Sequence, residues 1–85
     1  MNQNEIDFIK SVLGNHYSKA IIEHLNKKQI YNSNGNPFTG GALRKIVNGF
    51  NKNEDVEMEI LKFTARIKKN KIVNAIKREA FIKEI

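Results

Sequence analysis

The stretch from residue 17 to residue 50 constrains the fold of this chain most strongly, because it combines two helical patterns with a turn between them. In the first pattern, apolar residues recur at spacings of three and four and therefore share one face of a helix. These residues are Tyr17, Ala20, Ile21 and Leu25. The second pattern is shorter and places Leu43, Ile46 and Val47 on its inward side. We therefore predict two short helices that pack against each other across a turn.

The residues between the two predicted helices favour a turn. Asn34-Gly35 is the dipeptide that most readily takes positive φ at both central turn positions. Pro37 holds Asn36 out of the helical region. Ile30, which follows the first helix, is expected to be buried, and the arms of the turn could pair briefly as a minimal hairpin. The chain is therefore expected to reverse its direction here.

Both ends of the second predicted helix carry recognisable signals. Thr39 can accept a hydrogen bond from a free N–H group in the first turn, and Asn48-Gly49 provides a left-handed stop. Two helices joined in this way have the outline of a helix-turn-helix, which we place at residues 17–49.

The order of these residues resembles two families of DNA-binding helix-turn-helix proteins. One is the Cro/repressor type of phage regulators, in which the second helix ends in a hydrophobic pair followed by Asn-Gly, as positions 46–49 do here. The other is the DNA-binding segment of large serine recombinases. The residues that carry this second likeness are Ile21, Leu25, Asn26, Ile30, Gly35, Pro37, Phe38 and Thr39. The resemblance covers about 45 residues and implies DNA binding through the second helix.

Two positions depart from these families. Gln29 stands where they usually have glycine, and Gly40-Gly41 occupies the first turn of the second helix, where such proteins carry base-reading side chains. The two glycines weaken a helix by up to about 1 kcal/mol each relative to alanine. They also allow backbone N–H groups to come close to a phosphate. The two glycines therefore weaken the expectation of sequence-specific readout, while they leave the expectation of the fold unchanged.

A first helix is expected before this motif, with a role in packing the core. Its apolar residues share one arc of the helix, and they are Ile6, Ile9, Val12 and Leu13. A capping arrangement could come from Asn2 with Glu5 or from Asn4 with Asp7, and Gly14 ends the helix.

Residues 54–85 form a further helical region whose internal arrangement is open. Asn53 can cap a helix whose first turn is acidic and therefore complements the helix dipole. Two apolar stripes lie on opposite sides, one of Val56, Ile60, Phe63 and Ile67 and the other of Met58, Leu61 and Ala65. Later apolar residues are Ile72, Val73, Ile76 and Ala80. If residues 69–71 bend, the segment folds back as a hairpin. Otherwise one helix of about 48 Å projects from the domain and pairs with another subunit.

The formal net charge of +6 lies in the last part of the chain. Residues 1–60 hold seven basic and seven acidic residues, whereas residues 61–85 hold eight basic and two acidic ones. The eight basic residues are Lys62, Arg66, Lys68, Lys69, Lys71, Lys77, Arg78 and Lys83. This excess favours a surface that binds phosphate or an acidic partner, and a merely solubilising face is the alternative.

On the helix-turn-helix, Arg44 and Lys45 are expected to project outward from the second helix. Arg44 is predicted to reach a guanine edge, while Lys45 and nearby Lys52 contact phosphate. Alternatively, these charges are only solvated. The predicted nucleic-acid site of the motif therefore comprises Thr39, Gly40, Gly41, Arg44, Lys45 and Lys52.

Catalysis is not expected. His16 and His24 are eight residues apart without a carboxylate at ligand spacing, and the acidic cluster that begins at Glu54 is explained by its place at a helix start. There is no cysteine for a disulfide or a thiolate zinc site, and no apolar run long enough to cross a bilayer. We therefore expect neither a metal nor a cofactor, and we expect a cytoplasmic location.

The sequence as a whole predicts a single all-α domain, residues 1–85, with four to five helices. The expected function is that of a small nucleic-acid-binding protein, a phage or mobile-element transcriptional regulator that binds DNA more readily than RNA. A homodimer through residues 54–85 is a further possibility. The alternative function is a phage-encoded anti-CRISPR-type inhibitor that docks its basic face on a host nuclease, because a helix-turn-helix fold does not by itself establish DNA binding.

Overall fold

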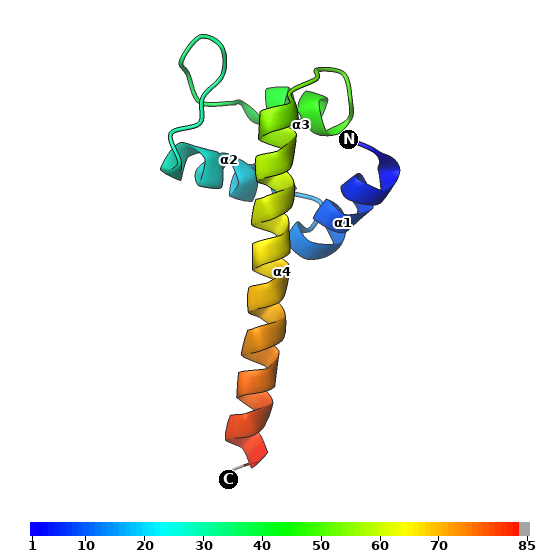
Figure 1. The fold of residues 1–85 in the computed structure, drawn as a ribbon, viewed down its shortest axis with the longest axis vertical. Coiled ribbons are helices and arrows are strands. Elements are labelled where there is room, and N and C mark those ends of the chain that lie inside the picture. Colours follow the sequence, from blue (N-terminus) through cyan, green and yellow to red (C-terminus); the bar gives the residue numbers. More distant parts are fainter. Residues whose placement is uncertain (84–85) are drawn as a thin grey trace.

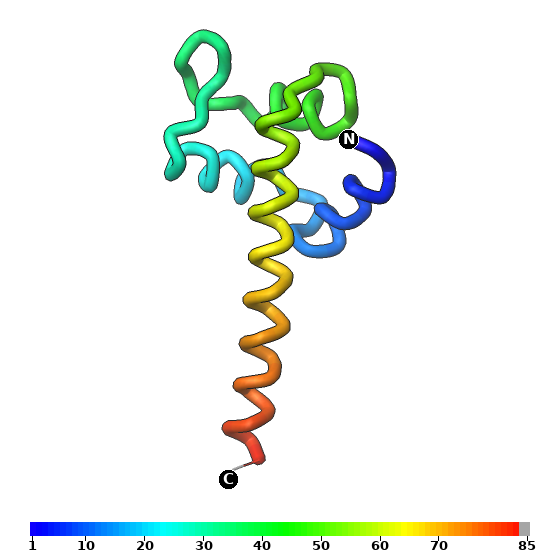
Figure 2. Tube along the Cα trace, in the orientation of Figure 1, coloured from blue at the N-terminus to red at the C-terminus, as the bar shows by residue number. Residues whose placement is uncertain are grey.

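The computed structural model describes residues 1–83, which contain four α-helices and no strand (Figure 1). The helices are α1 (Gln3–Leu13), α2 (Tyr17–Lys27), α3 (Gly40–Val47) and α4 (Glu54–Lys83). α1 and α2 pack against the first half of α4, α3 packs against α2, and the second half of α4 extends away from them (Figure 2). The molecule therefore has a helical head and a projecting helix, with overall dimensions of 54 × 27 × 19 Å. The prediction of an all-α fold is confirmed.

The core is formed where the apolar faces of the four helices meet. Its buried residues are Ile6, Ile9, Tyr17, Ile21, Leu25, Phe38, Leu43, Ile46, Val47, Val56 and Ile60. Most residues of the predicted inward faces of α1, α2 and α3 are buried, whereas Leu13 and Ala20 are only half-buried. On α4 only one of the two predicted apolar stripes enters the core, since Val56 and Ile60 are buried while Met58 is exposed.

Local hydrogen bonds define where α1 begins and ends. Asn2 Oδ1 accepts from the backbone N–H of Glu5 at 2.8 Å, and Glu5 Oε1 accepts from the N–H of Asn2 at 2.9 Å. The structure thus uses the Asn2–Glu5 capping box of the two arrangements that the sequence allowed. Gly14 ends the helix with φ of 86°.

Gln29 ends α2 in a backbone conformation that glycine usually takes. Its φ is 57°, and the N–H groups of Gln29 and Ile30 bond to the carbonyl oxygens of Asn26 and Leu25. These two bonds form a Schellman motif, in which the residue with positive φ is normally glycine. Ile30 is half-buried and packs against the core, close to the burial predicted for it.

Replacing Gln29 by glycine is expected to stabilise the protein by about 0.5–1 kcal/mol, because glycine has no Cβ to penalise positive φ. Urea denaturation followed by circular dichroism measures the change. Lys28→Gly is the control, because Lys28 has φ of −88° and glycine offers no relief there. A Gln29→Gly protein no more stable than the parent would show that Gln29 carries no strain.

The loop between α2 and α3 spans residues 28–39 and is organised differently from the prediction. Gly35 has φ of 78°, but Asn34 does not take positive φ, so the expectation of positive φ at both positions is wrong. The side chain of Asn32 accepts hydrogen bonds from the N–H groups of Asn34 and Asn36, both at 3.0 Å. The Asn32 side chain thus stabilises the turn that was expected from the Asn34-Gly35 dipeptide. The loop is also longer than the three to four residues of a compact helix-turn-helix.

The C-terminal region is one continuous helix and not a hairpin. α4 runs through residues 69–71 without a bend and extends to Lys83. Lys71 Nζ donates to the carbonyl oxygen of Val12 at 2.7 Å, and Lys68 Nζ lies 5.6 Å from the ring centre of Phe8. These contacts fix α1 to the middle of α4. Residues 68–83 are all exposed to solvent. Of the two arrangements that the sequence left open, the projecting helix is the one that forms.

Candidate nucleic-acid interface

α3 presents one apolar and one polar side, as its sequence predicts. Leu43, Ile46 and Val47 are buried, and Arg44 and Lys45 are exposed. The helix is capped by Thr39, whose Oγ1 accepts from the N–H of Ala42 at 3.1 Å. Thr39 is therefore committed to the helix start, and the exposed cations of α3 are Arg44 and Lys45.

The first turn of α3 offers backbone N–H groups to the solvent. Gly40 and Gly41 occupy its first two positions, where N–H groups have no partner within the helix. Neither glycine takes positive φ, so the backbone conformation alone does not require glycine at these sites. A Cβ added at Gly41 would meet open space. Because the glycines have no side chains to cover it, the backbone at this end of α3 can be approached closely by a ligand.

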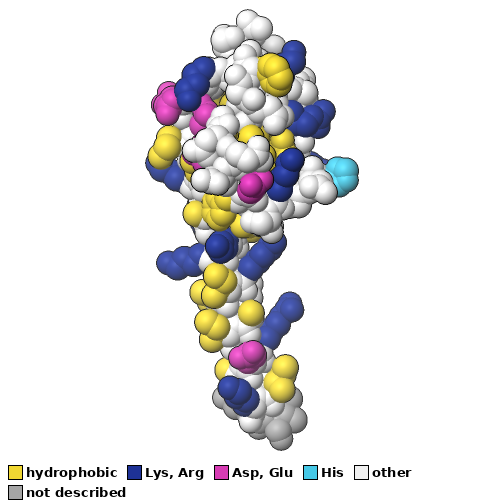
Figure 3. All heavy atoms as spheres, turned by 90° about the vertical axis from the view of Figure 1, so that its right-hand side faces the viewer, with side chains coloured by type: hydrophobic (Ala, Val, Ile, Leu, Met, Phe, Trp, Pro, Cys, Tyr) yellow, Lys and Arg dark blue, Asp and Glu magenta, His cyan; other side chains and the backbone are white. Residues whose placement is uncertain are grey.

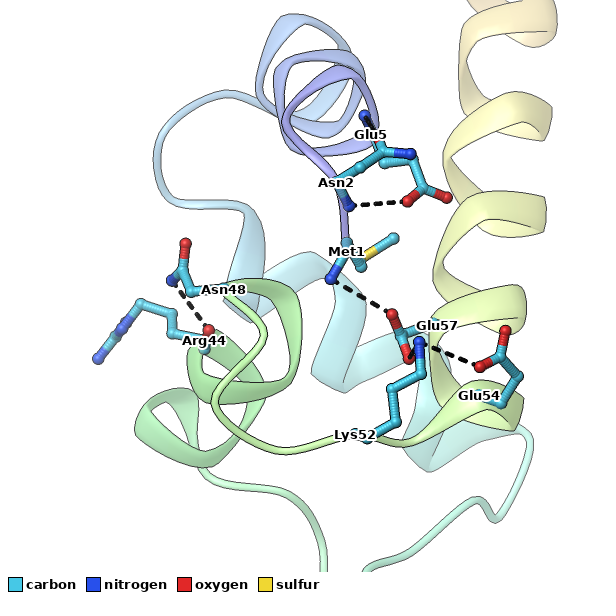
Figure 4. A network of polar contacts seen from close by, with 8 residues as sticks. All are labelled: Met1, Asn2, Glu5, Arg44, Asn48, Lys52, Glu54 and Glu57. Atoms are coloured by element: carbon cyan, nitrogen blue, oxygen red, sulfur yellow. Dashed lines mark hydrogen bonds and ion pairs between the residues drawn. The ribbon is translucent and has the colours of Figure 1, made fainter.

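Arg44 places its guanidinium group at this same turn. Its Nη1 donates to Ser18 Oγ on α2 at 3.3 Å, and a Cβ added at Gly40 would lie 3.5 Å from Nη1. Asn48 Nδ2 donates to the backbone oxygen of Arg44 at 2.9 Å (Figure 4). The guanidinium is thus held near the N-terminal turn of α3, at the positive end of the helix dipole, while its other N–H donors remain for a ligand.

Lys52 lies beside two carboxylates at the start of α4, and its predicted contact with phosphate stays a prediction. Its Nζ lies 3.1 Å from Glu54 Oε2 and 3.3 Å from Glu57 Oε2, and the amino group of Met1 lies 3.3 Å from Glu57 Oε1 (Figure 4). The carboxylates of Glu54 and Glu57 accept from the Lys52 ammonium and raise the pKa of Lys52. Burial acts to raise the pKa of Glu57, but Lys52 and the Met1 amine together lower it. Lys52 thus neutralises the start of α4.

The eight basic residues of the C-terminal part do not form one face. At about 100° per residue, Lys62, Arg66, Lys69 and Lys77 fall in one third of the helix circumference. Lys71 and Arg78 fall on the side that faces the core, and Lys68 and Lys83 fall elsewhere. Figure 3 shows basic side chains to both sides of the projecting helix. The expectation of a single basic face on this segment is therefore wrong.

The two predicted basic regions also lie at different ends of the molecule. α3 packs in the head, beside the first turns of α4, whereas Lys77, Arg78 and Lys83 lie toward the far end of the projecting helix (Figure 1). Lys68 and Lys71 lie between these regions and hold α1. The structure thus separates the cations of α3 from those of the last turns of α4.

A polar cluster between α2 and α4 was not foreseen from the sequence. His24 Nε2 and Lys28 Nζ lie 2.8 and 2.9 Å from Glu59 Oε1, and the His24 ring stacks on Phe63 with centroids 4.3 Å apart. The hydrogen bond from Lys28 lowers the pKa of Glu59 most, and the hydrogen bond from His24 lowers it further. Within residues 1–83, no three His, Asp or Glu side chains gather as they would around a metal ion. The contacts of His24 and Lys28 with Glu59 join the end of α2 to α4.

Comparisons of the chain with protein-family models, curated proteins and solved structures gave no match. No helix among residues 1–83 is long and apolar enough to cross a membrane. The likeness to Cro/repressor and serine recombinase helix-turn-helix segments stays a prediction from the residues.

Proposed function

We propose that this protein binds nucleic acid, duplex DNA in preference to RNA, through the outward side of α3. The observation that carries the proposal is the place of the Arg44 guanidinium, which Ser18 holds beside the N-terminal turn of α3. A guanidinium and free backbone N–H groups at a helix N-terminus are together suited to a phosphate group. Lys45, also exposed, adds a second cation on the same helix.

The chemistry of this surface favours phosphate contact over base readout. Gly40 and Gly41 have no side chain that could reach a base edge. The guanidinium of Arg44 donates a hydrogen bond to Ser18, which holds it against the protein and away from a base edge. Phosphate contacts position a protein on DNA but carry no direct sequence information. We therefore expect modest discrimination between DNA sequences. Within this proposal, the biological role is that of a small phage or mobile-element regulator, as the resemblance implies.

The second candidate is a phage-encoded anti-CRISPR-type inhibitor that occupies the nucleic-acid channel of a host nuclease. It is favoured by the same lack of base-reading side chains at Gly40 and Gly41, since a protein that blocks a nuclease needs no sequence readout. In this case the partner would be a protein that remains bound after all nucleic acid has been digested.

A salt series tests the leading proposal. Fluorescence anisotropy measures affinity for a labelled duplex DNA and for an RNA duplex of the same sequence. With on the order of three phosphate contacts, DNA affinity is expected to fall about 40-fold between 50 and 200 mM salt. Undetectable binding to DNA at the lower salt concentration would contradict the proposal. A nuclease that the protein retains from a nuclease-treated host lysate would then support the second candidate.

A further inference from the structure

α4 carries a continuous apolar stripe on the side that faces away from the core. Its members follow one another at spacings of three, four or seven residues and fall within about 60° of each other around the helix. They are Met58, Leu61, Ala65, Ile72 and Ile76. Met58, Ile72 and Ile76 are exposed, and Leu61 is half-buried. Figure 3 shows hydrophobic side chains along the projecting helix with basic side chains to either side. We call these five residues the outer stripe.

The stripe begins on the head and continues onto the projection. Met58 and Leu61 belong to the part of α4 that packs on the core with its other side, whereas Ile72 and Ile76 belong to the exposed segment. Helices in proteins gain most of their stability by packing an apolar face. A partner that covers the whole stripe would therefore stabilise both the projection and its junction with the head.

The exposed area of the chain is larger than that of a compact protein of its size. The accessible surface is 6243 Å². A folded monomer of this mass is expected to expose about 5,200 Å². The radius of gyration is 15.3 Å. About 12 Å is expected for this length. The excess of roughly 1,000 Å² is comparable to the 800 Å² or so that each partner contributes to a standard protein interface.

We infer that a second copy of this chain covers the outer stripe, with the two α4 helices antiparallel. The charges along α4 favour this orientation. The helix begins with Glu54 and Asp55 and carries Lys77, Arg78 and Lys83 near its other end. An antiparallel pair brings acidic starts beside basic ends, whereas a parallel pair brings the basic ends of both copies together. Antiparallel helix dipoles are also mutually favourable.

One register pairs four of the five outer-stripe residues with one another and leaves Met58 opposite Glu79. A two-fold axis beside residues 68 and 69 places Leu61 opposite Ile76 and Ala65 opposite Ile72. The same axis places Glu54 opposite Lys83. Residues 68 and 69 are lysines that lie on opposite flanks of the stripe, so their ammonium groups can reach solvent while their methylene groups cover the apolar contact. The interface is isologous, as a two-fold dimer requires.

Sedimentation equilibrium of the full chain tests the dimer. The expected mass is twice the 9.8 kDa of the monomer, and Ile76→Lys is expected to shift the protein to monomer. Phe81→Lys is the matched control, because Phe81 is 68% exposed, close to the 63% of Ile76, but lies off the stripe. Both variants are expected to fold, since neither side chain is buried. A parent protein that remains monomeric at about 100 μM would overturn the inference, as would equal effects of the two variants.

Cysteine cross-linking tests the orientation, because the natural chain has no cysteine. Ala65→Cys and Ile72→Cys proteins are mixed and oxidised gently. The antiparallel register predicts disulfides between the two different variants. Efficient disulfides between identical Ala65→Cys chains would overturn the antiparallel arrangement. The inference does not depend on nucleic-acid binding, since sedimentation is measured without any nucleic acid.

Discussion

Replacing Ile60 by alanine is expected to destabilise the protein by about 2–5 kcal/mol. Ile60 is fully buried, at 0% exposure, and belongs to the core that joins α4 to the other helices. Truncation removes apolar contact and leaves a cavity that the surrounding helices fill only in part. The total stability of a domain of this size is on the order of 4–13 kcal/mol. The variant is therefore expected to lose a large part of its stability, which urea denaturation followed by circular dichroism would measure.

Phe81→Ala is the control for this experiment. Phe81 lies on the same helix but is exposed, and truncation of an exposed side chain usually changes stability by no more than about 0.5 kcal/mol. If Ile60→Ala destabilised the protein no more than Phe81→Ala does, α4 would not be anchored to the head in the way the structure shows.

Reversing the charges of α3 by the double substitution Arg44→Glu and Lys45→Glu is expected to reduce affinity for duplex DNA about 100-fold, which corresponds to roughly 2.7 kcal/mol. Two phosphate contacts are lost and replaced by repulsion. Both side chains are exposed, so the helical fold is expected to persist apart from the loss of the bond to Ser18. Fluorescence anisotropy at low salt measures the affinity, and circular dichroism verifies the fold.

The matched control is the double substitution Lys77→Glu and Arg78→Glu. It changes the net charge by the same amount, again at two adjacent exposed positions, but toward the far end of the projecting helix. A loss of less than about 10-fold is expected, because only the long-range field of the protein changes. Equal losses in the two double variants would show that net charge, and not the surface of α3, governs binding.

Much of the fold follows from patterns that lie within a few residues of one another. The left-handed stop at Gly49 and the inward residues Leu43 and Ile46 were predicted correctly, and the capping box of Asn2 and Glu5 is one of the two arrangements that the sequence allowed. Each depends on helix periodicity or on a local hydrogen bond, and both are encoded by neighbouring residues.

The sequence analysis missed features where two turn conformations are both compatible with the local residues, or where side chains come into contact only in the folded chain. Asn34-Gly35 suggested a turn with two positive φ angles, but the side chain of Asn32 organises the loop instead. The pairing of Lys52 with Glu57 was not foreseen, because it becomes visible only once the chain folds. The contact between His24 and Glu59 spans 35 positions and has no periodic signal in the sequence.

The course of α4 could not be decided from its own residues. Residues 69–71 are polar but contain no glycine or proline, so they permit either a bend or a continuous helix. The bond from Lys71 to the carbonyl oxygen of Val12 accompanies the continuous helix, and it joins residues 59 positions apart. The arrangement of the tail cations depends on this outcome, which explains why a single basic face was expected from composition alone.

The most direct test of the account is an NMR titration of the isotopically labelled protein with duplex DNA at low salt. The account predicts that the largest amide shifts occur at Gly40, Gly41, Arg44 and Lys45. Shifts confined to residues 72–83, or none in α3, would contradict it.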